Sequence, residues 1–394
     1  MGHPARGSSH LAVRSARGRM TDYKLLVPAH LDTLPSYKPG KPVRQAELES
    51  GVSCIKLASN ENPFGPSPLA LEAIRRASTD VHFYPDNDLI ELRGALAEIH
   101  NLDSDQVMVT SGSTSFLDLL ARTLLHPGLN AVTSKHSFIV YPLVTRAAGA
   151  GLIELPTRNH HFDLDAIADA VNSETRVVYL ANPNNPTGTL LPAAEIDRFL
   201  DRMPAHVITV LDEAYYDYAS YFADQRGIEY SHALDYVRDG RRVVVLRTFS
   251  KAHGLAGLRV GYGFGPAELL AYFNRLKPPF MVSSLAETAA LAALADSHHI
   301  ANSVRSNAVE AERLRRELSS LGISVVPTWA NFMFCEIGDE CASLCRQLQD
   351  AGIIVRHLTG NWNAHHAFRL TVGRPEQNDQ FLHVLKKVMA KVPA

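Results

Sequence analysis

The sequence predicts an α/β fold with a mostly parallel central sheet and a smaller α+β domain near the C-terminus. Between about residues 67 and 280, short apolar runs alternate with amphipathic segments of helical period. Near-continuous apolar runs of this kind are typical of parallel strands that are buried on both faces. After about residue 280 the order changes, because two long helices precede several short strands and a closing helix. This second pattern indicates a separate, smaller sheet.

The elements of the larger part follow one another regularly. A helix begins after Ser67, a favoured N-cap residue, with Pro68 in its first turn. Residues 115–125 place apolar side chains at i, i+3 and i+4, which predicts a second helix. The apolar runs that predict strands of the central sheet are 106–111, 130–134, 150–155, 176–182, 206–212 and 241–249. In the smaller part, helices are predicted over 284–296, 299–320 and 376–389, and strands over 323–327, 331–337, 352–358 and 367–373.

We predict four regions along the chain: an N-terminal arm over 1–30, a segment over 31–56 that joins the small domain, a large domain over 57–280, and a small domain over 281–394. Residues 1–19 carry four arginines and no acid, which resembles the composition of a transit peptide. A disordered arm, with Met20 as the natural start, is the simpler interpretation. Because this stretch has no secretory hydrophobic region, we expect a cytoplasmic protein.

The composition argues against several classes of partner. With 39 basic and 41 acidic residues, the net charge of −2 offers no electrostatic basis for binding nucleic acid. No run of the sequence approaches the 18 apolar residues, roughly, of a membrane-spanning helix. Four cysteines are too few for a disulfide framework, and no further ligands lie at the close spacing of a zinc site. We therefore expect neither a nucleic-acid partner, nor a membrane partner, nor a bound metal.

Polar groups follow four of the predicted strands where each strand ends. SGST (111–114) follows the first strand and opens a helix, and Asn185 lies in NPNNPTG after the strand 176–182. Asp212 ends the strand 206–212, and Lys251 follows the strand 241–249. Taken singly, these groups are typical of a helix cap, a turn, a solvated strand end and a surface lysine. Ligands of open parallel sheets, however, bind beyond the carboxyl ends of the strands, so we expect one shared ligand.

Pyridoxal phosphate is a ligand that needs all of these groups. Its aldehyde needs an amine, its pyridine nitrogen a carboxylate, and its 3′-oxygen hydrogen-bond donors. Its phosphate needs a helix N-terminus and a cation. The candidates are Lys251 for the aldehyde, Asp212 for the nitrogen, Asn185 and Tyr215 for the 3′-oxygen, and Gly112, Ser113, Thr114, Ser250 and Arg259 for the phosphate. The sequence therefore predicts a pyridoxal-phosphate site.

The chain resembles the fold-type-I aminotransferases and, among them, the histidinol-phosphate aminotransferases. The resemblance runs from about Leu34 to the C-terminus, about nine-tenths of the chain. It rests on the motifs LPSYKPGKP (34–42), LASNENPFGPSP (57–68), FYPD (83–86), ANPNNPTGT (181–189), LDEAYYDY (211–218), TFSKAHGLAGLRVGY (248–262), ANF (330–332), GIIVR (352–356) and FRLTVG (368–373). The block from Lys251 to Arg259 and the NNPTG motif are specific to the superfamily, and NENPFGPSP is specific to the histidinol-phosphate branch and near relatives.

The resemblance implies a fold-type-I transferase that moves an amino group from L-histidinol phosphate to 2-oxoglutarate, giving imidazole acetol phosphate and glutamate in histidine biosynthesis. Lys251, Asp212 and Tyr215 would be the catalytic residues, and Lys251 would also move the proton of the reacting carbon. Such a role requires an amine that is neutral for part of the cycle.

Further residue roles are implied by the same resemblance. Tyr84 would reach the cofactor phosphate of the partner subunit, in a homodimer with composite active sites. Phe138 would stack on the pyridine ring. The residues implied to lie near the substrate are Tyr37, Asn60, Arg356 and Arg369.

Three segments depart from the family pattern and leave the amino donor open. They are GSTSF (112–116), KPPFMVSSLA (277–286) and HLTGNWNAHHAF (357–368). An aromatic amino acid aminotransferase is an alternative, favoured by Phe138, Trp329 and Trp362. A pyridoxal-phosphate-dependent decarboxylase of a phosphorylated amino acid is another, since such enzymes share the NENPFGPSP block. A cofactor-binding regulator with a DNA-binding module is a third, but residues 1–55 are too short and too proline-interrupted for that module.

Overall fold

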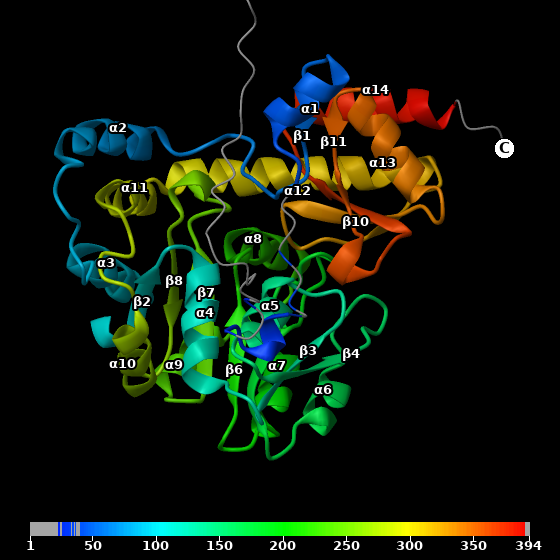
Figure 1. Cartoon of the computed structure of the whole chain (residues 1–394). Helices are drawn as coiled ribbons and strands as arrows, with labels where there is room; N and C mark the ends of the chain where they lie inside the picture. The colour runs from blue at the N-terminus through cyan, green and yellow to red at the C-terminus, as the bar shows by residue number, and fades with distance from the viewer. Residues whose placement is uncertain (1–22, 24–25, 33, 35, 37–39, 391–394) are drawn as a thin grey trace, which may run out of the picture.

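The computed structural model describes residues 23, 26–32, 34, 36 and 40–390, and a seven-stranded sheet forms the centre of its larger part (Figure 1). The strand order is β2-β8-β7-β6-β5-β3-β4, and every neighbouring pair is parallel except the two pairs that contain β8. The strands are β2 (Val107–Thr110), β3 (Asn130–Ser134), β4 (Gly151–Leu155), β5 (Thr175–Ala181), β6 (Ile208–Asp212), β7 (Val243–Thr248) and β8 (Gly261–Phe264). The prediction of a mostly parallel α/β sheet is confirmed.

Strand β8 is absent from the predicted strands, and its sequence explains why. GYGF contains two glycines and no β-branched residue, so its strand propensity is low. Packing requires both glycines: a Cβ atom at Gly261 would lie 2.6 Å from the backbone nitrogen of Ser113, and one at Gly263 would overlap the ring of Phe116. The two glycines therefore allow the helix that begins at Ser113 to lie directly against the backbone of this strand.

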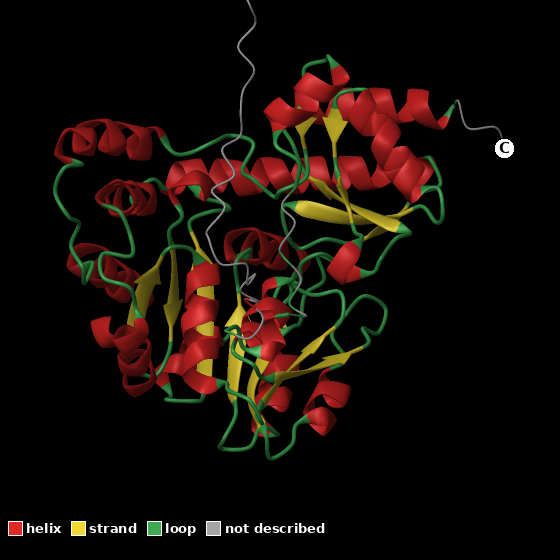
Figure 2. Ribbon diagram, in the orientation of Figure 1, coloured by secondary structure: helices red, strands yellow, loops and turns green. Residues whose placement is uncertain are grey.

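Helices surround this sheet, as Figure 2 shows. The hydroxyl of Ser67 accepts a hydrogen bond from the backbone N–H of Leu69, and Pro68 opens the first helix, as predicted. The helices of the larger part are α2 (Pro68–Ala77), α3 (Ile90–His100), α4 (Ser113–Leu124), α5 (Val140–Ala147), α6 (Leu164–Ala170), α7 (Ala193–Asp201), α8 (Tyr216–Arg226), α9 (Ala233–Arg238), α10 (Ala267–Leu276) and α11 (Ser284–Leu294). Alanines of α11 belong to the same apolar core as the central sheet.

A smaller antiparallel sheet lies beside the first one. Its strands, in the order β12-β13-β10-β9, are β9 (Ser324–Val326), β10 (Phe332–Glu336), β12 (Arg356–His357) and β13 (Ala367–Thr371). Nearby, β1 (Ile55–Lys56) pairs in parallel with β11 (Ile353–Ile354), which brings residues from before the large sheet to the C-terminal part. The smaller part is therefore α+β, as expected, whereas the predicted domain boundaries stay predictions.

The long helix α12 (Ser297–Ser320) runs past both sheets, as the yellow helix of Figure 1 shows. Beside the smaller sheet lie α1 (Val43–Ser50), α13 (Cys341–Asp350) and α14 (Pro375–Met389). Short 3₁₀ helices are η2 (Ala29–Leu31), η3 (Ser78–Asp80), η4 (Ser104–Gln106), η5 (Ala256–Leu258) and η6 (Gly360–Trp362). Across the part of the chain that the structure describes, no helix has the length and apolar character needed to cross a membrane. Tyr37 and most of the predicted arm over 1–30 lie outside the described residues.

Candidate active site

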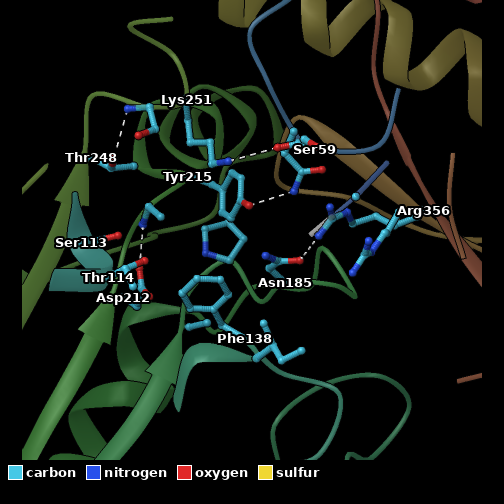
Figure 3. A pocket seen from close by; sticks show the side chains of 18 of the residues that line it. Ser59, Ser113, Thr114, Phe138, Asn185, Asp212, Tyr215, Thr248, Lys251 and Arg356 are labelled. Carbon is cyan, nitrogen blue, oxygen red and sulfur yellow. Dashed lines mark hydrogen bonds between the residues drawn. The ribbon is translucent and has the colours of Figure 1, made fainter. Parts of the chain in front are cut away.

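A cavity of about 260 Å³ lies where β2, β5, β6 and β7 end (Figure 3). Because these four strands run in the same direction, their carboxyl ends meet at one edge of the sheet. The smaller sheet supplies the opposite wall, through β12 and β13. The predicted site residues that line this cavity are Asn60, Ser113, Thr114, Phe138, Asn185, Asp212, Tyr215, Ser250, Lys251, Arg259, Arg356 and Arg369. The structure thus brings together groups that lie up to about three hundred residues apart in the sequence.

Lys251 lies in the turn after β7, and its amine points into the cavity (Figure 3). Its Nζ donates to the carbonyl oxygen of Ser59 at 3.4 Å and lies 5.5 Å from the centre of the Tyr215 ring. Burial, together with the positive charges of Arg369 and Arg259, lowers the pKa of this amine to about 8. Near neutral pH a larger share of the amine is therefore neutral than in an exposed lysine, which favours a nucleophile or a base.

Asp212 ends β6 as a buried carboxylate with two donors. One oxygen accepts from the hydroxyl of Tyr141 at 2.9 Å, and the other accepts from the backbone N–H of Ala214 at 3.2 Å. Burial raises the pKa of this carboxyl to about 6, against the opposing effect of both hydrogen bonds. Tyr141 is missing from the predicted site residues, although it lies three positions after Phe138. Its ring stacks on Tyr179 with centres 4.8 Å apart, which fixes the hydroxyl toward the carboxylate.

The N-terminus of α4 and a guanidinium form one corner of the cavity. Ser113 and Thr114 occupy the first turn of the helix, and Gly112 precedes them with a φ of 79°. A Cβ atom at Gly112 would overlap the guanidinium of Arg259, so this close approach requires glycine. Arg259 also donates to the hydroxyl of Ser250 at 3.4 Å. A helix N-terminus beside a fixed cation is suited to binding a phosphate group.

Three hydrogen bonds join residues from different walls of the cavity. The side-chain amide of Asn60 donates to the hydroxyl of Tyr215 at 2.9 Å. Arg369, on β13, donates to the side-chain oxygen of Asn185 and, at 2.8 Å, to the carbonyl oxygen of Ala58. Arg369 is buried, with 6% of its surface exposed. These bonds hold its guanidinium in a fixed place within the cavity.

The remaining wall of the cavity is aromatic. Phe138 and Trp362 both line it, and the guanidinium of Arg356 lies 5.3 Å from the centre of the Trp362 ring. Trp329 does not line the cavity and instead lies 4.3 Å from the guanidinium of Arg226. Of the three aromatic residues that favour an aromatic donor, two are therefore in a position to contact a substrate.

Tyr84 lies away from this cavity. Its side chain is 81% exposed, and its ring stacks on Phe280 with centres 4.6 Å apart. Its predicted contact concerns a partner subunit, so it stays a prediction. Among the described residues, no three histidine, cysteine or acidic side chains are grouped so as to hold a metal ion.

Comparison with known proteins finds a matching family, similar sequences and similar structures. The pattern of the family "Aminotransferase class I and II" matches residues 52–385. The chain is 43% identical to histidinol-phosphate aminotransferase 2 of Pseudomonas fluorescens, over 94% of this chain and 99% of that relative. It is 41% identical to the histidinol-phosphate aminotransferase of Moorella thermoacetica, over 91% of this chain and 92% of that relative. The crystal structure of histidinol-phosphate aminotransferase from Sinorhizobium meliloti in complex with pyridoxal-5'-phosphate is similar, with a TM-score of 0.84 and 27% identity over 96% of this chain and 100% of that chain. The chain therefore belongs to the class I and II aminotransferases.

Proposed function

We propose that this aminotransferase binds pyridoxal phosphate and transfers the amino group of L-histidinol phosphate to 2-oxoglutarate. The observation that carries the proposal is one cavity with a buried amine and a buried carboxylate on one sheet and two arginines on the other. The names of its relatives in Pseudomonas fluorescens and Moorella thermoacetica support this donor.

The residues of the cavity fit pyridoxal phosphate. Lys251 would hold the aldehyde carbon, Asp212 the ring nitrogen, and the first turn of α4 with Arg259 the phosphate. The bound cofactor supplies a ring that accepts electrons from the substrate carbon next to the amino group. In the protein without a bound cofactor, burial raises the pKa of Asp212 to about 6, against its two hydrogen bonds. A cationic ring nitrogen beside this carboxyl would favour its ionised form, as the chemistry requires.

Further groups would orient the cofactor. Asn185 and Tyr215 would donate to its 3′-oxygen, and the side chain of Asn60 fixes the hydroxyl of Tyr215. Phe138 would lie against the flat face of the ring, with its own ring held edge-on to Tyr141 at 5.6 Å between centres. Rigid support of this kind lowers the entropic cost of reaching the reactive geometry.

Lys251 would move the proton of the reaction. In its neutral form the amine would accept the proton from the reacting carbon of the substrate. In its charged form it would donate that proton again as the product forms. Since burial and the nearby arginines place its pKa at about 8, both forms are accessible near neutral pH. The cavity needs no second general base for this transfer.

The two arginines fit a site that must bind two different anions. Histidinol phosphate carries a phosphate and no carboxylate on its reacting carbon, whereas glutamate carries a carboxylate there. The planar guanidinium of arginine pairs in a bidentate manner with either anion. Arg369 is fixed by Asn185 and Ala58, and we assign it to the carboxylate of the 2-oxo acid. Arg356 is less buried, and we assign it to the phosphate.

A comparison of amino donors tests this assignment. The cofactor-loaded protein is given histidinol phosphate, phenylalanine, tyrosine or glutamate, and kcat/KM is measured for each. Arg369→Ala should impair both half-reactions, because it also removes the hydrogen bond that holds Asn185, whereas Arg356→Ala should impair histidinol phosphate more than glutamate. If an aromatic amino acid is preferred by tenfold or more, about 1.4 kcal/mol of transition-state binding, the protein is an aromatic aminotransferase instead. Phe138 and Trp362 in the cavity make this the second candidate.

We also propose a cytoplasmic homodimer in which Tyr84 reaches the partner's cofactor. Large apolar side chains beside it are also exposed, with its chain neighbour Phe83 at 66% and its stacking partner Phe280 at 41%. Exposed apolar groups of this size favour a protein interface. Sedimentation at micromolar concentration should give a dimer, and Tyr84→Ala should weaken cofactor binding. A monomer that retains full activity would contradict the composite site.

A further inference from the structure

The loop between β12 and β13 brings a tryptophan into the cavity. At the base of this loop, the N–H of Leu358 donates to the oxygen of Ala367 at 3.1 Å, and the N–H of Ala364 donates to the oxygen of Leu358 at 2.9 Å. The 3₁₀ helix η6 lies in the loop and ends at Trp362, which lines the cavity and is 5% exposed. The loop belongs to the segment 357–368, which departs from the family pattern.

Arg356 and Arg369 are direct neighbours across the β12–β13 pair. Residues in this relation project to the same face of a sheet, and two like charges placed there destabilise the pair. The indole of Trp362 lies against both: its ring centre is 5.3 Å from the guanidinium carbon of Arg356 and 5.9 Å from that of Arg369. Attraction between a cation and the face of an aromatic ring offsets the repulsion between the two cations.

Trp362 is itself fixed from the other sheet. Its indole N–H donates to the carbonyl oxygen of Ser137 at 2.9 Å. Ser137 directly precedes Phe138, and its hydroxyl donates to the side-chain oxygen of Asn184 at 2.9 Å. The ring therefore joins the arginine pair of the smaller sheet to the strand-end loops of the larger one.

We propose that Trp362 is a positioning and specificity-determining residue, which holds Arg356 beside Arg369 so that one cavity accepts both a carboxylate and a more distant phosphate. The inference rests on the proposed function. Without the ring, repulsion drives the two guanidinium groups apart. Arg369 stays in place because Asn185 and Ala58 hold it, so the less buried Arg356 is the one that moves.

Variants of Trp362 test this role in the cofactor-loaded protein. In Trp362→Ala, kcat/KM for histidinol phosphate should fall by about tenfold or more, mainly through KM, while the glutamate half-reaction falls less than about threefold. Trp362→Phe keeps an aromatic face but loses the N–H, and should recover most of the loss. Trp329→Phe is the matched control, because Trp329 also lies on an arginine but does not line the cavity. It should leave the ratio between the two half-reactions unchanged.

Equal losses in both half-reactions, or no loss in either, would overturn the inference. So would a Trp329→Phe variant that shifts the ratio as far as Trp362→Ala does. If the wild-type protein uses histidinol phosphate and Trp362→Ala leaves the ratio between the half-reactions unchanged, the inference is overturned but the proposed donor stands. Wild-type protein that uses phenylalanine but not histidinol phosphate overturns the proposed donor as well.

Fluorescence gives a second readout that does not depend on turnover. The chain has two tryptophans, so Trp329→Phe leaves Trp362 as the single source of tryptophan emission. In the cofactor-loaded variant, inorganic phosphate and 2-oxoglutarate should each change its emission. A further Arg356→Ala substitution should weaken the response to phosphate more than the response to 2-oxoglutarate. Emission that is unaffected by either anion would contradict a ring that lies against both anion-binding arginines.

Discussion

Replacing Asp212 with asparagine should stabilise the cofactor-free protein. Burial raises the pKa of this carboxyl to about 6 in the folded chain, whereas an unfolded aspartate has a pKa of about 3.9. Because each pKa unit corresponds to about 1.4 kcal/mol, ionised Asp212 costs about 3 kcal/mol of folding free energy at pH 8. The sign of this contribution to the folding free energy is opposite to that of an ionised aspartate in a salt bridge. The carboxyl contributes its full stability below pH 4, roughly, and this contribution is lost as the pH rises through about 6.

Asparagine suits the test because it matches aspartate in shape. Its oxygen can accept from the N–H of Ala214, and its NH₂ group can donate to Tyr141, whose hydroxyl rotates to accept. The assay is denaturant unfolding of cofactor-free wild type and Asp212→Asn at pH 8 and pH 5. The variant should be more stable by about 3 kcal/mol at pH 8 and by about half of that at pH 5. An equal or lower stability of the variant at pH 8 would refute the reasoning.

The same substitution should have the opposite effect on the loaded enzyme. There the carboxylate faces a cationic ring nitrogen in the proposed arrangement, and asparagine removes one partner of a buried charge pair. Such a loss costs about 3–5 kcal/mol, so turnover should fall about a thousandfold. A loss below about tenfold would show that Asp212 does not face the ring nitrogen.

Further predictions concern Lys251, Gly112 and the buried ion pair of Arg247 and Glu213. The rate at which cofactor-free protein takes up pyridoxal phosphate should rise with pH and level off above about 8, the lowered pKa of Lys251. A rate that keeps rising up to the ordinary lysine pKa of about 10.4 would contradict the lowered value. Lys251→Ala should abolish both turnover and the absorbance band of the lysine-bound cofactor. Gly112→Ala should displace the Arg259 guanidinium and weaken cofactor binding, measured by titration, whereas unchanged affinity would show that Arg259 does not contact the cofactor phosphate. Arg247→Ala should leave Glu213 buried without the guanidinium that pairs with it at 2.8 Å and cost about 3–5 kcal/mol of unfolding free energy, where a cost below about 1 kcal/mol would contradict a strong buried pair.

The residues of the larger sheet could be predicted from the sequence because of a general property of parallel strands. Their carboxyl ends meet at one edge, so Asp212 and Lys251, which end or follow apolar runs, have to converge there. The correct direction of these strands follows from the alternation with helices. Tyr141 was missed because its role depends on the angle at which α5 packs, although its spacing of three from Phe138 was a usable signal.

The arginine pair could not be derived in the same way. The facing of Arg356 and Arg369 depends on the register of an antiparallel pair, and a slip of one residue would send one of them to the opposite face. The register is set by the loop that carries Trp362, and its conformation, with Asn363 at a φ of 50°, does not follow from an apolar pattern. The resemblance to a family supplied these two residues, whereas strand and helix periodicity did not.

The two sheets contribute different functional groups to the cavity, and this difference has a physical basis. The larger sheet provides fixed strand ends, and a buried amine and carboxylate with shifted pKa values need such rigid, water-poor surroundings. The smaller sheet presents two cations from a hairpin, where loop length and register can change without disturbing the core. Donor choice can therefore change through residues such as Trp362 while the cofactor groups stay in place. Substitutions on the hairpin should accordingly alter which amine is accepted, whereas substitutions at the ends of β6 and β7 should alter whether any amine is accepted at all.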